Sequence, residues 1–208
     1  AGRDVYFGCS KFATNENRTK DNVLAIKSFW LDIDCGEKKA ELNPKTGRPD
    51  GYIDQATGLQ ALRDFCNTIG LPRPIMVNSG RGIHAYWPLS NSVTRQEWEP
   101  VANRLNELCV IHKFYVDAQV FEAARILRIP DTKNFKDDPA HDVVFMSDAD
   151  DVEFEALKNL LGVKEKTFVP SASQGMSELA KALAANTANR FSKIMQRSAK
   201  GEGFKQLW

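Results

Sequence analysis

Two aspartates interrupt the most apolar stretch of the chain. The segment Phe29-Trp30-Leu31-Asp32-Ile33-Asp34 has the pattern of a buried β-strand with two carboxylates one residue apart. Because strand side chains alternate between faces, Asp32 and Asp34 point to the same side. Such a pair repels and is costly to desolvate unless a cation or strong hydrogen-bond donors compensate. A divalent ion such as Mg²⁺ or Mn²⁺, which prefers carboxylate oxygens, is the simplest compensation. The alternative is a strand end with two solvated aspartates.

Periodic patterns along the chain predict a mixed α/β domain over residues 1–168. Strands are expected near 4–9, 27–34, 75–78, 83–87 and 141–146, and helices over 54–69, 94–109 and 151–161. Asp54 is a candidate helix cap, and Thr94 with Glu97 forms a capping-box pattern. Residues 36–52 are rich in Gly, Pro and charge, which predicts an exposed loop. Apolar residues 114–116 deliver a further carboxylate, Asp117, which we expect at a strand end.

Composition restricts the classes of protein that fit. A chain of 208 residues is long enough for one large or two small domains. Its net charge of +1 means that any nucleic acid must be held by local basic patches and metal ions. Four scattered cysteines without a Cys-x-x-Cys pair predict free thiols in a reducing compartment. Without an apolar run of about 18 residues or a signal peptide, we expect a cytoplasmic protein with no membrane contact.

The region after residue 168 has a different character. Residues 169–176, rich in Ser with Pro170 and Gly175, are predicted to be a linker. Residues 177–208 are predicted to begin a helical module, because apolar residues recur at helical spacing between 177 and 198. We expect that this module is cut short and that the chain is part of a longer protein.

A glycine-rich turn carries the second group of candidate residues. Ser79-Gly80-Arg81-Gly82-Ile83-His84 combines two glycines, a guanidinium and a histidine within six residues. Glycines let backbone N–H groups approach a phosphate, and Arg81 and His84 can donate to its oxygens. The alternative is an ordinary hairpin turn in which His84 fills a half-buried strand position.

A basic segment, residues 125–136, follows Asp117. If it is extended, Arg125 and Arg128 face opposite ways, so only one of them need enter a site. We expect Arg128 to do so and Arg125 to pair elsewhere. The alternative for this segment is a solvated basic strand.

The order of these motifs resembles the archaeo-eukaryotic primase superfamily, specifically the primase-polymerases of phages, plasmids and mobile elements. The resemblance rests on Leu31-Asp32-Ile33-Asp34, Ser79-Gly80-Arg81-Gly82-Ile83-His84, Val116-Asp117 and residues 125–136, and it covers roughly residues 3–165. It implies a sheet related to the RNA-recognition-motif fold, joined to an N-terminal α/β unit. One departure is Asp131, which stands where phage members usually have Gly at a turn.

The resemblance also implies roles for individual residues. It implies that two divalent ions, Mg²⁺ or Mn²⁺, are bound by Asp32, Asp34 and Asp117. Gly82-Ile83-His84 matches the small-x-His motif, whose histidine contacts the incoming triphosphate, and Arg128 matches a triphosphate-binding arginine. Ser79 and Arg81 are nearby nucleotide-binding candidates, and Lys133, Asn134 and Lys136 are candidates for contacts with nucleic acid. Glu122 is expected either to support the metal-binding residues without binding the metal itself or to be structural.

The function that follows from the resemblance is template-directed nucleotidyl transfer, as by a DNA primase or primase-polymerase that replicates a phage or mobile element. The expected partners are a single-stranded DNA template, NTP or dNTP, and a helicase domain or partner, in the host cytoplasm. Two alternatives stay open: a metal-dependent nuclease, and a non-catalytic module that binds single-stranded nucleic acid. The wide dispersion of His84, His112 and His141 argues against rolling-circle initiators, which need a His-hydrophobic-His motif.

Overall fold

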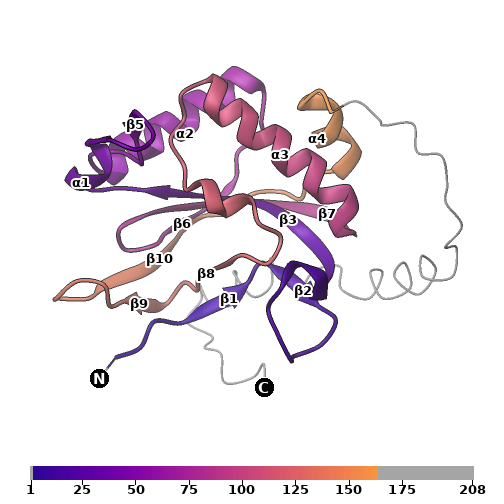
Figure 1. Cartoon of the computed structure of the whole chain (residues 1–208), viewed down its shortest axis with the longest axis horizontal. Coiled ribbons are helices and arrows are strands. Elements are labelled where there is room, and N and C mark those ends of the chain that lie inside the picture. The colour runs from indigo at the N-terminus through magenta and orange to yellow at the C-terminus, as the bar shows by residue number, and fades with distance from the viewer. Residues whose placement is uncertain (1, 164–208) are drawn as a thin grey trace, which may run out of the picture.

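The structure, a computed structural model, describes residues 2–163. The predicted linker at 169–176 and the predicted helical module at 177–208 lie outside the described residues. The expected α/β class is confirmed: helices and a curled antiparallel sheet alternate along the chain (Figure 1).

A six-stranded antiparallel sheet forms the centre of the fold, in the order β2-β3-β7-β6-β10-β9. Its strands are β2 (Ser10–Phe12), β3 (Val23–Asp34), β6 (Ile75–Asn78), β7 (Gly82–Val93), β9 (Thr132–Asn134) and β10 (His141–Ser147). Two neighbouring strands, β3 and β7, are 12 residues each and therefore longer than the sequence pattern indicated. Two small sheets accompany it, β1 (Tyr6–Gly8) with β8 (Ile126–Arg128) and β4 (Leu42–Asn43) with β5 (Arg48–Pro49).

The helices lie along one side of the sheet, as Figure 1 shows for α2 and α3. They are α1 (Glu37–Ala40), α2 (Gln55–Ile69), α3 (Arg95–Ile111) and α4 (Phe154–Leu160), with short 3-10 turns η1 (Lys20–Asn22) and η2 (Ala118–Phe121). Asp54 caps α2 by accepting from the Thr57 N–H at 2.7 Å, and Thr94 and Glu97 form the predicted capping box of α3. Both predicted helix starts are confirmed.

The register of β3 and β7 decides which residues face the helices. Ile33 pairs with Ile83 and Asp32 with His84, so these two pairs lie on opposite faces. The first pair packs under α2, where a Cβ on Gly58 would lie 3.4 Å from both isoleucine side chains. Asp32 and His84 therefore face away from α2.

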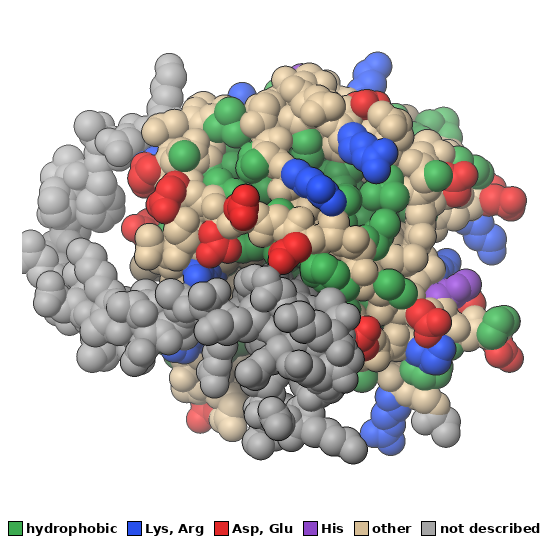
Figure 2. Space-filling view, turned by 180° about the vertical axis from the view of Figure 1, so that it is seen from behind, with side chains coloured by type: hydrophobic (Ala, Val, Ile, Leu, Met, Phe, Trp, Pro, Cys, Tyr) green, Lys and Arg blue, Asp and Glu red, His purple; other side chains and the backbone are tan. Residues whose placement is uncertain are grey.

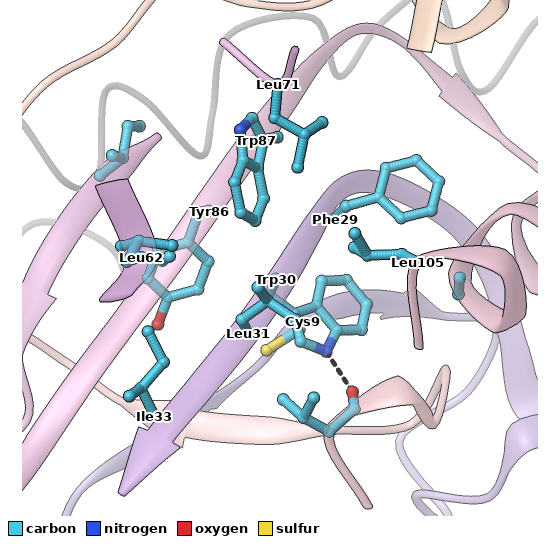
Figure 3. Close-up of a cluster of buried hydrophobic side chains, with 14 of the residues drawn as sticks. Cys9, Phe29, Trp30, Leu31, Ile33, Leu62, Leu71, Tyr86, Trp87 and Leu105 are labelled. Atoms are coloured by element: carbon cyan, nitrogen blue, oxygen red, sulfur yellow. Dashed lines mark hydrogen bonds between the residues drawn. The ribbon is translucent and has the colours of Figure 1, made fainter. Parts of the chain in front are cut away.

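The β1–β8 ribbon covers the face that carries Asp32 and His84. The Phe7 ring lies 6.2 Å from the Tyr86 ring on β7, and the Cys9 N–H donates to the Arg125 carbonyl at 2.9 Å. Cys9, Trp30 and Leu31 belong to one cluster of buried side chains (Figure 3). All four cysteines are buried and free, as predicted.

Two segments differ from the sequence-based expectation. Residues 36–52 are not a simple loop but hold α1 and the β4–β5 hairpin, because the Lys39 carbonyl accepts from the N–H groups of Asp50 and Gly51. Residues 114–117 are not a strand; Asp117 instead caps η2 by accepting from the Gln119 N–H at 2.9 Å. No helix between residues 2 and 163 is both long and apolar enough to cross a bilayer.

Asp131 adopts the left-handed conformation that a glycine would take without strain. Its φ is 63°, and its N–H donates to the Val143 carbonyl at 2.8 Å. We expect Asp131→Gly to raise the free energy of unfolding by roughly 0.5 kcal/mol, because relief of the left-handed strain outweighs the added entropy of the unfolded chain. Urea denaturation measures the change. The control is Asp64→Gly inside α2, where glycine should destabilise; loss of stability in both variants would contradict the prediction.

Candidate functional site

Three aspartates lie together at the end of β3: two belong to the strand, and the third comes from a distant segment of the chain. Asp32 and Asp34 lie on one face of the strand, as their spacing predicts. Asp117 arrives from the loop after α3, and its N–H donates to the Asp32 carbonyl at 2.9 Å. This backbone hydrogen bond places Asp117 beside Asp32. The prediction that Asp117 lies at a strand end is wrong, since Asp117 is the N-cap of η2.

Arg125 joins two of these carboxylates. Its Nη2 lies 3.2 Å from Asp32 Oδ2 and also donates to Asp117 Oδ2. From the sequence, Arg125 was expected to pair away from the site. Arg125 instead pairs with carboxylates of the site, because β8 begins only at Ile126 and Arg125 precedes the extended segment.

Lys39 forms an ion pair with the third carboxylate, Asp34. Its Nζ lies 2.7 Å from Asp34 Oδ2, and this hydrogen bond raises the pKa of Lys39. The lysine reaches Asp34 from α1, in the segment that the sequence predicted to be a loop. Two side-chain cations therefore balance three carboxylates.

The electrostatics of Asp32 show why cations gather here. The pKa of Asp32 is raised to about 6: burial is the main cause, the neighbouring charges of Asp34 and Asp117 also raise it, and Arg125 lowers it. A negative charge at Asp32 is costly unless a cation stays close.

The donor chemistry of the cluster suits a hard divalent ion, since carboxylate oxygens are the ligands that Mg²⁺ and Mn²⁺ prefer. The arrangement, however, already holds side-chain cations: Arg125 contacts Asp32 and Asp117, and Lys39 contacts Asp34. Within residues 2–163 no three His, Cys, Asp or Glu side chains are grouped as metal ligands. A divalent ion held by Oδ2 of Asp32 and Oδ2 of Asp117 would compete with the guanidinium of Arg125 for these oxygens.

His84 lies opposite Asp32 on the neighbouring strand and is only 2% exposed. Its Nε2 is 3.7 Å from Asp32 Oδ1, and its Nδ1 is 3.2 Å from the Tyr86 hydroxyl. Burial, together with Arg128 and Arg125, lowers the pKa of His84 to about 3. The imidazole is therefore neutral at physiological pH. If Tyr86 donates to Nδ1, His84 carries its proton on Nε2, toward the acid cluster.

Arg128 lies close enough to influence His84 but is held by the N-terminal segment. Its Nη2 donates to Asp4 Oδ2 at 3.1 Å and to the Tyr6 hydroxyl at 2.8 Å, and its guanidinium carbon lies 4.9 Å from the centre of the Tyr6 ring. Both Arg125 and Arg128 keep a buried Nε that has no hydrogen-bond partner among the described residues. Unsatisfied cationic donors beside a histidine favour an anionic ligand.

The predicted hairpin turn is confirmed, with the Ser79 N–H donating to the Gly82 carbonyl at 2.9 Å. Gly82 has a packing role, because a Cβ there would lie 2.3 Å from the Ile33 carbonyl oxygen. Arg81 pairs with Asp137 at 3.3 Å on the surface. Nucleotide contacts of Ser79, Arg81 and Gly82 stay predictions.

The candidate nucleic-acid residues occupy different environments. Asn134 is 1% exposed, and its side chain donates to the Ser79 carbonyl at 2.9 Å and accepts from the Lys136 N–H. Lys133 and Lys136 are exposed, and Lys133 pairs with Asp142 at 2.6 Å. Asn134 therefore links β9 to the hairpin turn, while contacts of all three residues with nucleic acid stay predictions.

Two hollows of the described surface lie away from the acid cluster. One, of about 660 Å³, is lined by residues 72–73, 148–153 and 156. Another, of about 460 Å³, lies beside α2; its lining includes the apolar residues Leu62, Cys66, Leu71 and Met76 and the cationic residues Arg63 and Arg73. Seen from behind, the molecule gathers hydrophobic side chains at the centre of the face, with Lys and Arg side chains among them (Figure 2). Neither hollow is lined by Asp32, Asp34, Asp117 or His84.

Comparison with solved structures identifies the fold. The chain is similar to the archaeo-eukaryotic primase (AEP) domain of the primase-polymerase (PrimPol) of cyanophage S-2L, with a TM-score of 0.52 and 14% sequence identity over 76% of this chain and 70% of that chain. No family model and no curated protein matches the sequence. The chain therefore has the fold of an archaeo-eukaryotic primase domain, and its chemistry has to be argued from its own site.

Proposed function

We propose that the chain is a nucleotidyltransferase that extends or starts a nucleic-acid strand on a single-stranded template. The observation that carries the proposal is the convergence of Asp32, Asp117 and His84 on one face of the sheet, with Arg125 between the two carboxylates. The fold, similar to that of a primase-polymerase domain, supports the same reaction class.

In this reaction the 3′-hydroxyl oxygen of the growing strand bonds to the α-phosphorus of a nucleoside triphosphate. The bond from that phosphorus to the bridging oxygen of the β-phosphate breaks, pyrophosphate leaves, and the hydroxyl proton passes to solvent. Asp32, Asp34 and Asp117 would hold divalent ions, which when bound lower the pKa of the hydroxyl and stabilise the leaving group.

The chain's own residues bind and orient the triphosphate. His84 Nε2 offers a neutral N–H beside Asp32, so it donates to a phosphate oxygen without adding charge. Arg125 and Arg128 add cationic charge and offer the two unpartnered Nε–H groups. The burial of His84 and Arg128 excludes water from these contacts.

The direct test is primer extension by the purified chain on single-stranded DNA, with labelled NTP or dNTP and either Mg²⁺ or Mn²⁺. We expect extension in which each added nucleotide is complementary to the template, and omission of the complementary nucleotide should stop it. Products on an unprimed template would make the chain a primase. Template degradation without extension would instead indicate a nuclease, and retention of DNA without chemistry would indicate a binding module.

The proposal includes a biological setting. Template-directed synthesis of this kind would serve replication of a phage or mobile element in the host cytoplasm, together with a helicase domain or partner. Co-purification of the longer protein, or of this chain with its neighbours, followed by an ATP-dependent unwinding assay, tests the helicase association.

A further inference from the structure

Side-chain cations contact one oxygen of each carboxylate in the acid cluster. A single nitrogen, Arg125 Nη2, contacts Oδ2 of both Asp32 and Asp117, and Lys39 Nζ contacts Oδ2 of Asp34. Each carboxylate of the cluster thus has a cation from the chain itself.

We propose that Arg125 is a resident cation of the Asp32–Asp117 pair that exchanges with a divalent ion, and that the released guanidinium then binds the anionic ligand. The inference rests on the proposed function. It concerns how the acid cluster is loaded: Arg125 holds the two carboxylates together in the metal-free protein and gives them up when the ion enters.

Shared contacts make the two occupants exclusive. Arg125 Nη2 lies on Oδ2 of both Asp32 and Asp117, so a divalent ion held by these two oxygens would compete with the guanidinium for them. A guanidinium and a divalent ion also repel, and the repulsion is strong in a partly buried site, where screening is weak. The Arg125 side chain is 19% exposed and Asp32 18%, so the pair has such an environment.

Once released, the Arg125 side chain has donors that an anionic ligand beside His84 could accept from. Arg125 Nε is buried without a hydrogen-bond partner among the described residues, so its present position leaves a donor unsatisfied. Arg125 is also close enough to His84 to contribute to its low pKa. A small movement of the guanidinium would present its donors to an anion at His84 while the backbone stays fixed by the bond between the Arg125 carbonyl and the Cys9 N–H.

The test measures Mn²⁺ binding without nucleotide, by electron paramagnetic resonance of the free ion, on Arg125→Gln and Arg125→Lys. Removing the charge should lower the Mn²⁺ dissociation constant by about fivefold or more, the size of a typical coupling between two ligands. Arg125→Lys keeps a cation and should stay near wild type. The matched control is Arg95→Gln, because Arg95 bridges Asp21 at 3.4 Å and Glu99 at 3.3 Å on the surface; it should change nothing.

Unchanged or weaker Mn²⁺ binding by a folded Arg125→Gln protein would overturn the exchange. If the wild type nevertheless extends primers with Mn²⁺, the proposed function stands and only the exchange fails. If neither wild type nor Arg125→Gln binds Mn²⁺, both fail.

A second measurement needs no charge-removing variant. In wild-type protein labelled with ¹⁵N-arginine, addition of Mg²⁺ should shift the Arg125 Nε resonance, assigned with Arg125→Lys, and leave that of Arg95 unchanged. An Arg125 resonance that does not move while Mg²⁺ binds would also overturn the proposal.

Discussion

Asp32→Asn is expected to reduce templated nucleotide incorporation by at least about 1,000-fold, because it removes the most buried carboxylate of the cluster that we propose binds divalent ions. The amide keeps the volume of the carboxylate, and Arg125 keeps its contact with Asp117. Single-nucleotide incorporation on a primed template measures the loss. Asp64→Asn, an exposed carboxylate on α2, is the control and should retain wild-type activity.

The same variant should remain folded, and its stability should depend differently on pH. Burial raises the pKa of Asp32 from 3.8 to about 6, so between these values the folded protein binds a proton that the unfolded chain has released. Wild-type stability attributable to Asp32 is therefore present below pH 4 and is lost as pH rises through about 6. Melting curves of the metal-free proteins should show this decline in wild type relative to Asp32→Asn. Incorporation that survives in a folded Asp32→Asn protein would contradict the assignment.

Local signals predicted much of the fold. The alternation of Asp32 and Asp34 with Leu31 and Ile33 indicated a strand with both carboxylates on one face, and β3 has that arrangement. The helix caps Asp54 and Thr94 could be predicted because each side chain accepts a hydrogen bond from the backbone N–H three residues later. Such features depend on neighbours in sequence, so one sequence is enough to infer them.

The partners of the acid cluster depend on contacts between distant segments. Arg125 reaches Asp32 only because β8 pairs with β1, and Lys39 reaches Asp34 only because α1 folds back on the end of β3. No periodic pattern reports either contact. The contact between Tyr86 and His84 is local by comparison. Tyr86 lies two residues after His84 on β7, and strand alternation by itself puts both side chains on the same face.

Trp30→Ala should lower the free energy of unfolding by about 3–5 kcal/mol, the usual cost of truncating a buried aromatic residue. Trp30 is 1% exposed, and its ring stacks on Trp98 of α3 with 4.8 Å between ring centroids. Its indole N–H also donates to the Val120 carbonyl of η2 at 2.7 Å, the bond drawn as a dashed line in Figure 3. The variant therefore leaves a cavity and an unsatisfied carbonyl. Urea denaturation monitored by circular dichroism measures the change.

Trp30→Phe separates packing from the hydrogen bond, and the hydrogen bond bears on the site because Asp117 is the N-cap of η2. The phenyl ring retains a stack on Trp98 but frees the Val120 carbonyl, so we expect a smaller stability loss of about 1–3 kcal/mol. Because η2 loses its hydrogen bond to the indole of residue 30, Asp117 is held less firmly, and nucleotide incorporation should fall even at temperatures where the variant is fully folded. Trp98→Phe is the matched control, since it removes a similar bond, from the Trp98 indole to the Ser28 carbonyl at 3.0 Å, and keeps the bond from Trp30 to Val120. Equal losses of incorporation in the two folded variants would show that the Trp30–Val120 bond does not position Asp117.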